Sequence, residues 1–308
     1  MKTNNLMIIS CFLAMAGISS CTIENELGEP YKVSTIKATD ANNLNVRTAL
    51  NGYNVTWTTN DVLSFYNNDT QENKTFTLRD GEAGKSTGMF DADKGNDLTE
   101  GQWIAYYPKT MNRYFPGQNT LNLTTCTQSA KNDYSHIITR DWLTSSPVTI
   151  EEGVDAPNLR MEHNFALIRY DIRLQDIPED SKSALTQIVL YSGDNSQAFS
   201  AGANFNGKSV IFSNTAASIA VNTTAIDVDT NYTPMWVTIN QLSEVSSIML
   251  RAYFNYTDWE GTLFQTSADV TMNKNGKFEA GKLYTIKLTL HINEGKPNES
   301  TLSIDSFS

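Results

Sequence analysis

The stretch LYTIKLTLHIN, residues 283–293, alternates apolar and polar side chains with a period of two. The apolar positions are Tyr284, Ile286, Leu288, Leu290 and Ile292, and threonine, lysine and histidine fill the positions between them. Successive side chains of a β-strand point to opposite faces of its sheet, whereas a helix repeats every 3.6 residues. The pattern therefore predicts a strand with one buried face and one exposed face.

The stretch FALIRYDIRL, residues 165–174, shows the same alternation, and short apolar runs recur along the chain between turns rich in Gly, Asn and Asp. Many short strands at roughly 8–12-residue spacing are typical of β-sandwiches. We therefore expect an all-β chain. No stretch shows a sustained helical period: the best helix candidate, EDSKSALTQ (179–187), is short, and we expect the overlapping LTQIVLYS (185–192) to form a strand. A loop-like stretch at 145–158 marks the expected boundary between two domains.

Charge and cysteine content argue against polyanionic partners and against an internal disulfide bond. The formal net charge is −11, which disfavours nucleic acid and anionic lipid because both are polyanions. Of the three cysteines, Cys11 and Cys21 lie in the N-terminal segment described next, so Cys126 is left without an internal disulfide partner. The fold must therefore depend on its hydrophobic core.

The N-terminus has the pattern of a bacterial lipoprotein signal. Lys2 precedes the apolar run 6–18, which is too short to span a bilayer comfortably, and the run ends in ISSC (18–21). We expect removal of residues 1–20 and acylation of Cys21, with 21–30 as a tether to the membrane. The alternative is an ordinary secretory signal whose cleavage site happens to precede a cysteine.

Motifs for catalysis or metal binding are incomplete. Gly84-Lys85-Ser86 lacks the rest of a phosphate-binding loop, and DADKGND (91–97) lacks the later ligands of a calcium loop. The three histidines show no paired spacing. We expect His163 to pack or to form hydrogen bonds. The sequence predicts no enzyme, no cofactor and no metal site.

Local patterns in a fixed order resemble the fimbrillin family, the lipoprotein precursors of pili on Gram-negative anaerobes. They are, in order, VRTAL (46–50), VTWTTNDVLSFY (55–66), AYYP (105–108), RMEHNFALIRYDIRL (160–174) and GKLYTIKLTL (281–290). Asn60 departs from the family pattern, because relatives often have glycine there. The resemblance implies two tandem transthyretin-like β-sandwiches, here assigned to 31–150 and 151–308.

The resemblance also implies a route of assembly. A fimbrillin precursor reaches the outer membrane as a surface-exposed lipoprotein, and a trypsin-like, arginine-specific protease removes its lipid and first strand. A C-terminal strand of the next fimbrial subunit then fills the groove. In this chain the matching cut lies between Arg47 and Thr48, after a possible first strand at 31–39. The alternative is that RTAL itself belongs to a strand.

The donor-strand candidate is the tail STLSIDSFS (300–308), in which Leu302 and Ile304 alternate and Phe307 follows out of phase. The leading interpretation is a structural or adhesive pilus subunit with the outer membrane, the protease and other subunits as partners. The alternative is a non-polymerising outer-membrane lipoprotein that binds glycans. Its stacking platform would use Tyr106, Tyr107, Tyr114 and Trp259, although core packing is the more ordinary role of such residues.

Overall fold

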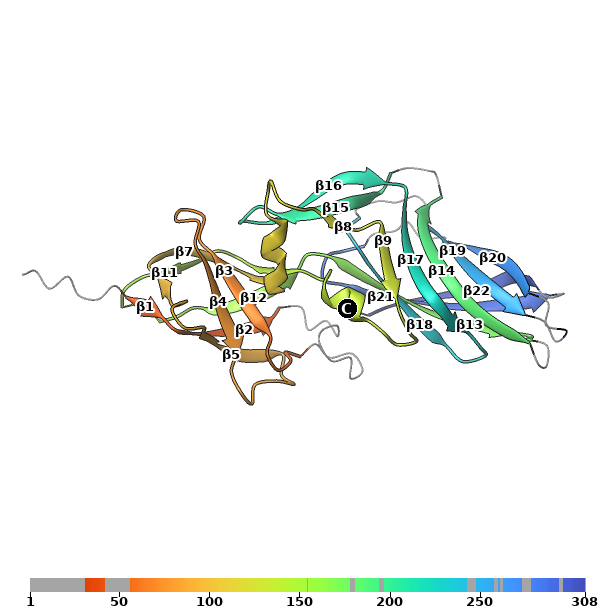
Figure 1. The fold of residues 1–308 in the computed structure, drawn as a ribbon, viewed down its shortest axis with the longest axis horizontal. Helices are drawn as coiled ribbons and strands as arrows, with labels where there is room; N and C mark the ends of the chain where they lie inside the picture. Colours follow the sequence, from red (N-terminus) through yellow and green to blue (C-terminus); the bar gives the residue numbers. More distant parts are fainter. Residues whose placement is uncertain are drawn as a thin grey trace, which may run out of the picture. The chain divides into compact units, whose positions relative to one another are not determined.

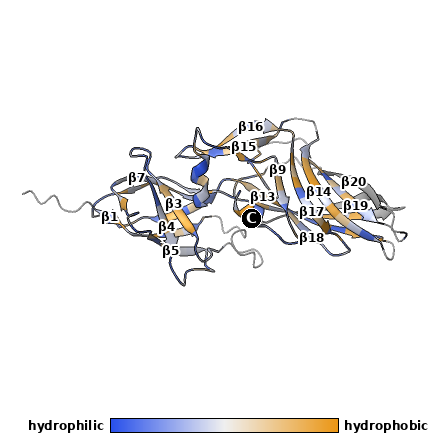
Figure 2. Ribbon diagram, in the orientation of Figure 1, coloured by the Kyte–Doolittle hydropathy of each residue, from blue (hydrophilic) through white to orange (hydrophobic). Residues whose placement is uncertain are grey.

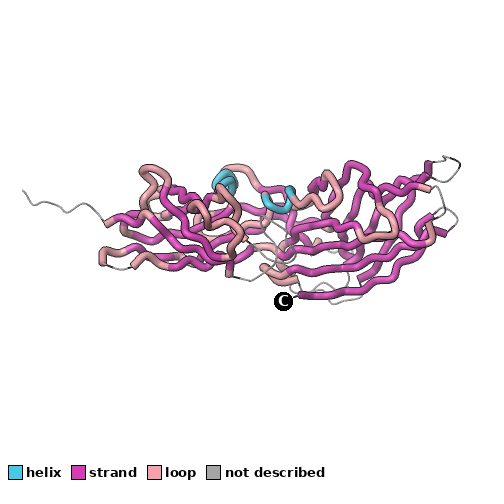
Figure 3. Tube along the Cα trace, turned by 90° about the horizontal axis from the view of Figure 1, so that it is seen from below, coloured by secondary structure: helices cyan, strands magenta, loops and turns pink. Residues whose placement is uncertain are grey.

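In the computed structural model, most of the described residues lie in β-strands (Figure 3). The structure describes residues 31–41, 56–153, 155–177, 181–193, 197–242, 248–257, 260, 263–272, 278–293 and 296–307. The unit Tyr31–Ser308 is compact. No helix among the described residues is long and apolar enough to cross a membrane.

An eight-stranded sheet forms the first half of the fold, in the order β10-β12-β2-β5-β4-β3-β7-β11 (Figure 1). β10 pairs with β7 as well as with β12, so the sheet closes around its own core. The strands β1 (Lys32–Val33) and β6 (Leu98–Thr99) pair with each other in a separate two-stranded sheet. The eight strands are β2 (Thr35–Asp40), β3 (Val62–Tyr66), β4 (Asn73–Leu78), β5 (Thr87–Ala92), β7 (Gly101–Tyr107), β10 (Leu143–Ser145), β11 (Val148–Ile150) and β12 (Asn158–His163).

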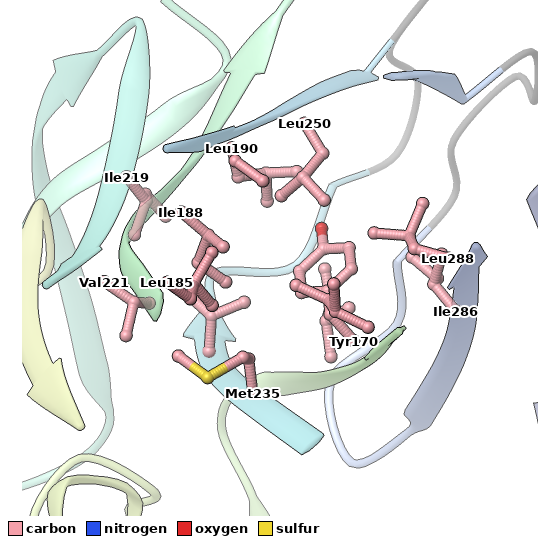
Figure 4. Packing of buried hydrophobic residues seen from close by; sticks show 14 of the residues in the cluster. Tyr170, Leu185, Ile188, Leu190, Ile219, Val221, Met235, Leu250, Ile286 and Leu288 are labelled. Atoms are coloured by element: carbon pink, nitrogen blue, oxygen red, sulfur yellow. The ribbon is translucent and has the colours of Figure 1, made fainter. Parts of the chain in front are cut away.

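Two further sheets face each other across a second core. One has the order β18-β13-β21-β22 and the other β20-β19-β14-β17-β9. Their strands are β9 (Thr125–Gln128), β13 (Ala166–Gln175), β14 (Lys182–Ser192), β17 (Ser218–Asp227), β18 (Thr233–Ile239), β19 (Ile248–Thr257), β20 (Leu263–Met272), β21 (Leu283–Asn293) and β22 (Lys296–Phe307). Apolar side chains from both sheets meet between them (Figure 4).

The remaining elements are short. A three-stranded sheet joins β16 (Val210–Ala216), β15 (Phe199–Phe205) and β8 (Leu121–Asn122). The helices are the 3₁₀ turn η1 (Lys109–Tyr114) and α1 (Ser135–Ile138). Hydrophobic residues lie along the strands, whereas the loops are mostly hydrophilic (Figure 2). The prediction of an all-β chain built from β-sandwiches is confirmed.

The alternation of FALIRYDIRL is confirmed in β13. The side chains on its apolar face are fully buried in the second core: Ala166, Ile168, Tyr170, Ile172 and Leu174. The alternation of β21 understates its burial, because Thr285 and Thr289 on the polar face are only 2% and 7% exposed. β21 is an interior strand between β13 and β22, so it has less access to water than a strand at an edge.

The strand expected at 185–192 is confirmed as part of β14, whereas the described part of the helix candidate, 182–187, is not helical but begins the same strand. β14 pairs with β17 on one side and β19 on the other. A β-bulge between Leu185 and Gln187 puts one extra residue into the strand. Leu185 and Ile188 both face the core as a result, three positions apart, and this spacing imitates one face of a helix.

Asn60, the departure from the fimbrillin pattern, occupies a turn with a positive φ of 70°. Glycine adopts this left-handed region freely, and asparagine is among the few other residues that do so routinely. Asp61 stabilises the turn, because its Oδ2 accepts a hydrogen bond of 2.7 Å from the backbone N–H of Thr58. Asn60 therefore occupies a turn position that glycine would also suit.

Strands from each side of the expected boundary at residue 150 belong to sheets formed mainly by the other side. β12 follows that point in the chain but belongs to the eight-stranded sheet, while β9 precedes it and pairs in parallel with β17. The division into 31–150 and 151–308 stays a prediction.

Candidate functional site

The strand β2 lies inside the eight-stranded sheet. It runs parallel to β12, with Leu159 opposite Ala38, and antiparallel to β5, with Phe90 opposite Ile36. Ile36 and Ala38 are 1% and 0% exposed and belong to the first core. The backbone of β2 is therefore hydrogen-bonded on both edges, and one of its faces completes an apolar core.

Polar side chains tie β2 to β5 on its other face. Thr35 Oγ1 donates a hydrogen bond of 2.8 Å to Asp91 Oδ1, and the hydroxyls of Thr39 and Thr87 lie 3.0 Å apart. Arg79 donates to both oxygens of Asp91, and its hydrogen bond lowers the pKa of that carboxyl. This ion pair is exposed to solvent, so its contribution to stability is small.

The end of β2 meets a buried cluster of three ionisable side chains, which we call the Asp40–His163–Asp141 cluster. His163 Nε2 lies 3.1 Å from Asp40 Oδ2, and His163 Nδ1 lies 2.9 Å from Asp141 Oδ1. The three side chains are 2–5% exposed. Each ring nitrogen faces a carboxylate, and a carboxylate only accepts hydrogen bonds, so the ring must carry both protons.

The electrostatics of the cluster agree with this geometry. Burial alone lowers the pKa of His163, but the charge of Asp141 and the hydrogen bonds to Asp141 and Asp40 outweigh it and raise the pKa to about 9. At neutral pH His163 is therefore a buried imidazolium between two carboxylates. The expectation that His163 forms hydrogen bonds is confirmed.

The cluster joins three segments that are distant in sequence. Asp40 ends β2, His163 ends β12, and Asp141 precedes β10. The backbone adds a further link, because the N–H of Ala41 donates to the carbonyl of Met161 at 2.8 Å. The C-terminal end of β2 is thus held to β12 by one charge-assisted hydrogen bond and one backbone hydrogen bond.

The tail forms β22, at the edge of the four-stranded sheet. It pairs antiparallel with β21, with Leu302 opposite Leu288, Ile304 opposite Ile286 and Phe307 opposite Leu283. Within the described part of its sheet, β22 has a strand on one side only. Its backbone therefore has one hydrogen-bonded edge, whereas that of β2 has two.

The structure brings together fewer of the predicted site residues than the sequence suggested. Cys21, Arg47 and Thr48 lie outside the described residues, as does Trp259. Tyr106, Tyr107 and Tyr114 are 0%, 5% and 8% exposed, so they pack in the interior and cannot form a stacking platform. Sequence reasoning did not find Asp40 and Asp141 as the partners of His163, because no local motif links residues 40, 141 and 163.

Solved structures share this fold. A proposed cell adhesion protein from Bacteroides uniformis has a TM-score of 0.57 at 15% identity, over 89% of this chain and 96% of its own. Proposed cell adhesion proteins from Bacteroides ovatus and Bacteroides fragilis have TM-scores of 0.51 and 0.50 at 13% and 11% identity. These two matches cover 91% and 90% of this chain and 98% of each of theirs.

No family model matches the sequence, and no curated protein does. The structural similarity shows that these proteins share the fold of this chain. At identities this low it does not show a shared function, which has to be argued from the site. The all-β fold that the resemblance to the fimbrillin family implies is confirmed.

Proposed function

We propose that the protein is a structural or adhesive subunit of a surface pilus, exported as a lipoprotein on Cys21 and assembled head to tail by strand exchange. The proposal includes cleavage between Arg47 and Thr48 by an arginine-specific protease. Its partners are the outer membrane, through the lipid, and other fimbrial subunits. It involves neither catalysis nor nucleic acid. The fold shared with proposed cell adhesion proteins supports the surface role.

The observation that carries the proposal is the position of β2, between β12 and β5 and N-terminal to Arg47. Cleavage after Arg47 would detach β2 from the rest of the chain. We call the vacated position between β12 and β5 the β2 slot. Its two flanking strands would present unpaired backbone groups, and its floor would lose the side chains of Ile36 and Ala38. Strand addition satisfies both needs at once.

The donor in this proposal is β22, with Leu302, Ile304 and Phe307 as its apolar side chains. In the described part of its own sheet β22 has one neighbour, β21, whereas in the β2 slot of the next subunit it would have two. Exchange therefore adds a hydrogen-bonded edge for the donor. Donor and slot lie on different parts of the chain, so the contact is heterologous and extends into a filament.

The glycan-binding alternative loses the platform on which it was based, because Tyr106, Tyr107 and Tyr114 are buried. The pilus proposal therefore stands first. Glycan binding through other residues is compatible with it.

The test is the N-terminal sequence of protein extracted from the cell surface, read beside a denaturing gel. We expect a start at Thr48 and a ladder of SDS-resistant polymers. The variant Arg47→Gln should keep its original N-terminus and form no ladder. Arg79→Gln, which removes an exposed arginine just after β4, is the matched control and should be processed normally. A wild-type start at Cys21 with a normal ladder would overturn the processing step.

A further inference from the structure

The five-stranded sheet has an outer face that does not take part in the second core. Ile188 and Leu190 of β14 and Leu250 of β19 point toward the facing sheet (Figure 4). Neighbouring residues in a strand alternate between faces, so Val189, Tyr191 and Arg251 lie on the outer side. Register agrees, because Val189 is directly opposite Arg251, and cross-strand partners share a face.

A hollow of about 230 Å³ opens on this outer face. Tyr191, Arg251 and Tyr253 form its walls, and the shorter side chains of Val189 and Ser218 lie among them. The hollow arises from this difference in size across neighbouring strands, since Ser218 is opposite Tyr191 and Val189 is opposite Arg251. The guanidinium carbon of Arg251 lies 5.6 Å from the ring centroid of Tyr191.

The lining combines two aromatic rings with several hydrogen-bonding groups. Tyrosine offers an apolar ring and a hydroxyl, arginine offers five N–H donors in a fixed plane, and serine both donates and accepts. One pyranose ring needs this combination, because it has an apolar C–H face and a rim of hydroxyls. The hollow is smaller than the ~300–1,000 Å³ of pockets for drug-sized ligands. Its size suits a single sugar ring.

Charge favours an uncharged sugar. In the register of β19 and β20 the Cα partner of Arg251 is Asp269, so the sequence places one basic and one acidic residue at this position of the sheet. The whole chain carries −11, which disfavours polyanionic ligands further. We propose that the outer face of β14, β17 and β19 binds one neutral hexopyranose unit of a glycan, through Tyr191, Tyr253, Arg251 and Ser218. This site is independent of strand exchange.

The test uses the full chain, purified in a detergent without a sugar head group, on an array of neutral and carboxylated glycans. We expect binding to neutral hexose-containing glycans, and calorimetry with one bound glycan then measures the variants. Tyr191→Ala and Tyr253→Ala should each weaken binding about tenfold, which is ~1.4 kcal/mol. Tyr253→Phe keeps the ring and should lose less affinity than Tyr253→Ala.

The matched control is Tyr232→Ala. Arg173 lies 4.6 Å from the ring centroid of Tyr232, so the pair has the same chemistry but does not line the hollow. This variant should bind within about twofold of the wild type, and the unfolding midpoint of each variant shows whether it is folded. Three results would each overturn the proposal: no glycan bound, binding confined to carboxylated sugars, or affinity unchanged in folded Tyr191→Ala and Tyr253→Ala. None of these results depends on polymer formation.

Discussion

His163 is a buried cation whose proton contributes to folding. Its pKa is about 9 in the folded protein and 6.5 in an unfolded chain. Because the folded state binds this proton more tightly, the stabilisation is complete below pH 6.5 and is lost as the pH rises through 9. One proton corresponds to a slope of at most about 1.4 kcal/mol per pH unit within that window.

The prediction is that stability falls between pH 6.5 and 9 more steeply in the wild type than in His163→Gln. Urea unfolding at several pH values measures both slopes. Asp141→Asn is the second variant, because it keeps the shape of the side chain, removes the carboxylate and should lower the pKa of His163. Equal slopes in wild type and in folded variants would show that His163 is not the titrating group.

Two buried tyrosines differ in whether their hydroxyl is satisfied. Tyr170 Oη points between the two sheets (Figure 4) and has no hydrogen-bond partner among the described residues. Tyr256 is equally buried, but its hydroxyl lies 2.9 Å from Ser181 Oγ. A buried hydroxyl without a partner costs about 1–3 kcal/mol, whereas a satisfied one contributes about 1 kcal/mol.

Tyr170→Phe should therefore leave the free energy of unfolding unchanged or raise it, and Tyr256→Phe should lower it by about 1 kcal/mol. Chemical unfolding of both variants provides the comparison, and each serves as the control of the other. If Tyr170→Phe were the more destabilised of the two, the hydroxyl of Tyr170 would have to be bonded.

At the scale of single elements, period-two patterns were reliable where the strand is regular. The apolar face of β13 is fully buried, as its alternation indicated. The strand expected at 185–192 is also present in β14, but its start was obscured, because one bulge puts Leu185 and Ile188 on the core face at a helix-like spacing. A bulge depends on pairing with β17 and β19, and these partners lie well beyond any local sequence window.

The candidate site was less predictable than the fold for the same reason. The sequence indicated that 31–39 forms a strand, but the pairing of β2 with β12 joins residues more than a hundred positions apart. Likewise, nothing near His163 in sequence points to Asp40. Contacts of this kind are set by the closure of the sheet, so only the structure reveals them.

The edge strand β22 leads to a prediction about truncation. Deletion of residues 299–308 removes most of β22 but leaves Ile286, Leu288 and Leu290 of β21 in the second core. We expect a folded monomer that cannot extend a polymer. Circular dichroism and thermal unfolding check the fold, and SDS-resistant ladders check assembly; a folded truncated protein that still gives normal ladders would contradict the donor role of the tail.

At the scale of the whole molecule, processing and the buried charge cluster are coupled. If cleavage after Arg47 releases β2, His163 loses Asp40 but keeps Asp141. Its pKa should then fall, because one of the groups that raises it has gone while burial still opposes the charge. Titration of the His163 ring by NMR in precursor and processed protein measures this directly, and identical titration curves would mean that β2 stays in place after cleavage.

The same release should create a site that a strand in solution can fill. Processed subunit without a neighbour exposes the β2 slot, so we expect it to bind a synthetic peptide of residues 296–308. A ligand that binds only the folded state raises stability, by about 2.7 kcal/mol at a hundredfold excess over its Kd. The unfolding midpoint of the processed subunit should therefore rise with peptide concentration, while the unprocessed precursor, whose slot is occupied by β2, should not respond.

A peptide with Leu302→Asp and Ile304→Asp keeps the backbone groups but cannot bury its side chains in the core, so it separates apolar recognition from backbone pairing. If the altered peptide stabilised the processed subunit as well as the natural one does, the tail would not be recognised by its side chains, and the donor would have to be sought elsewhere in the chain.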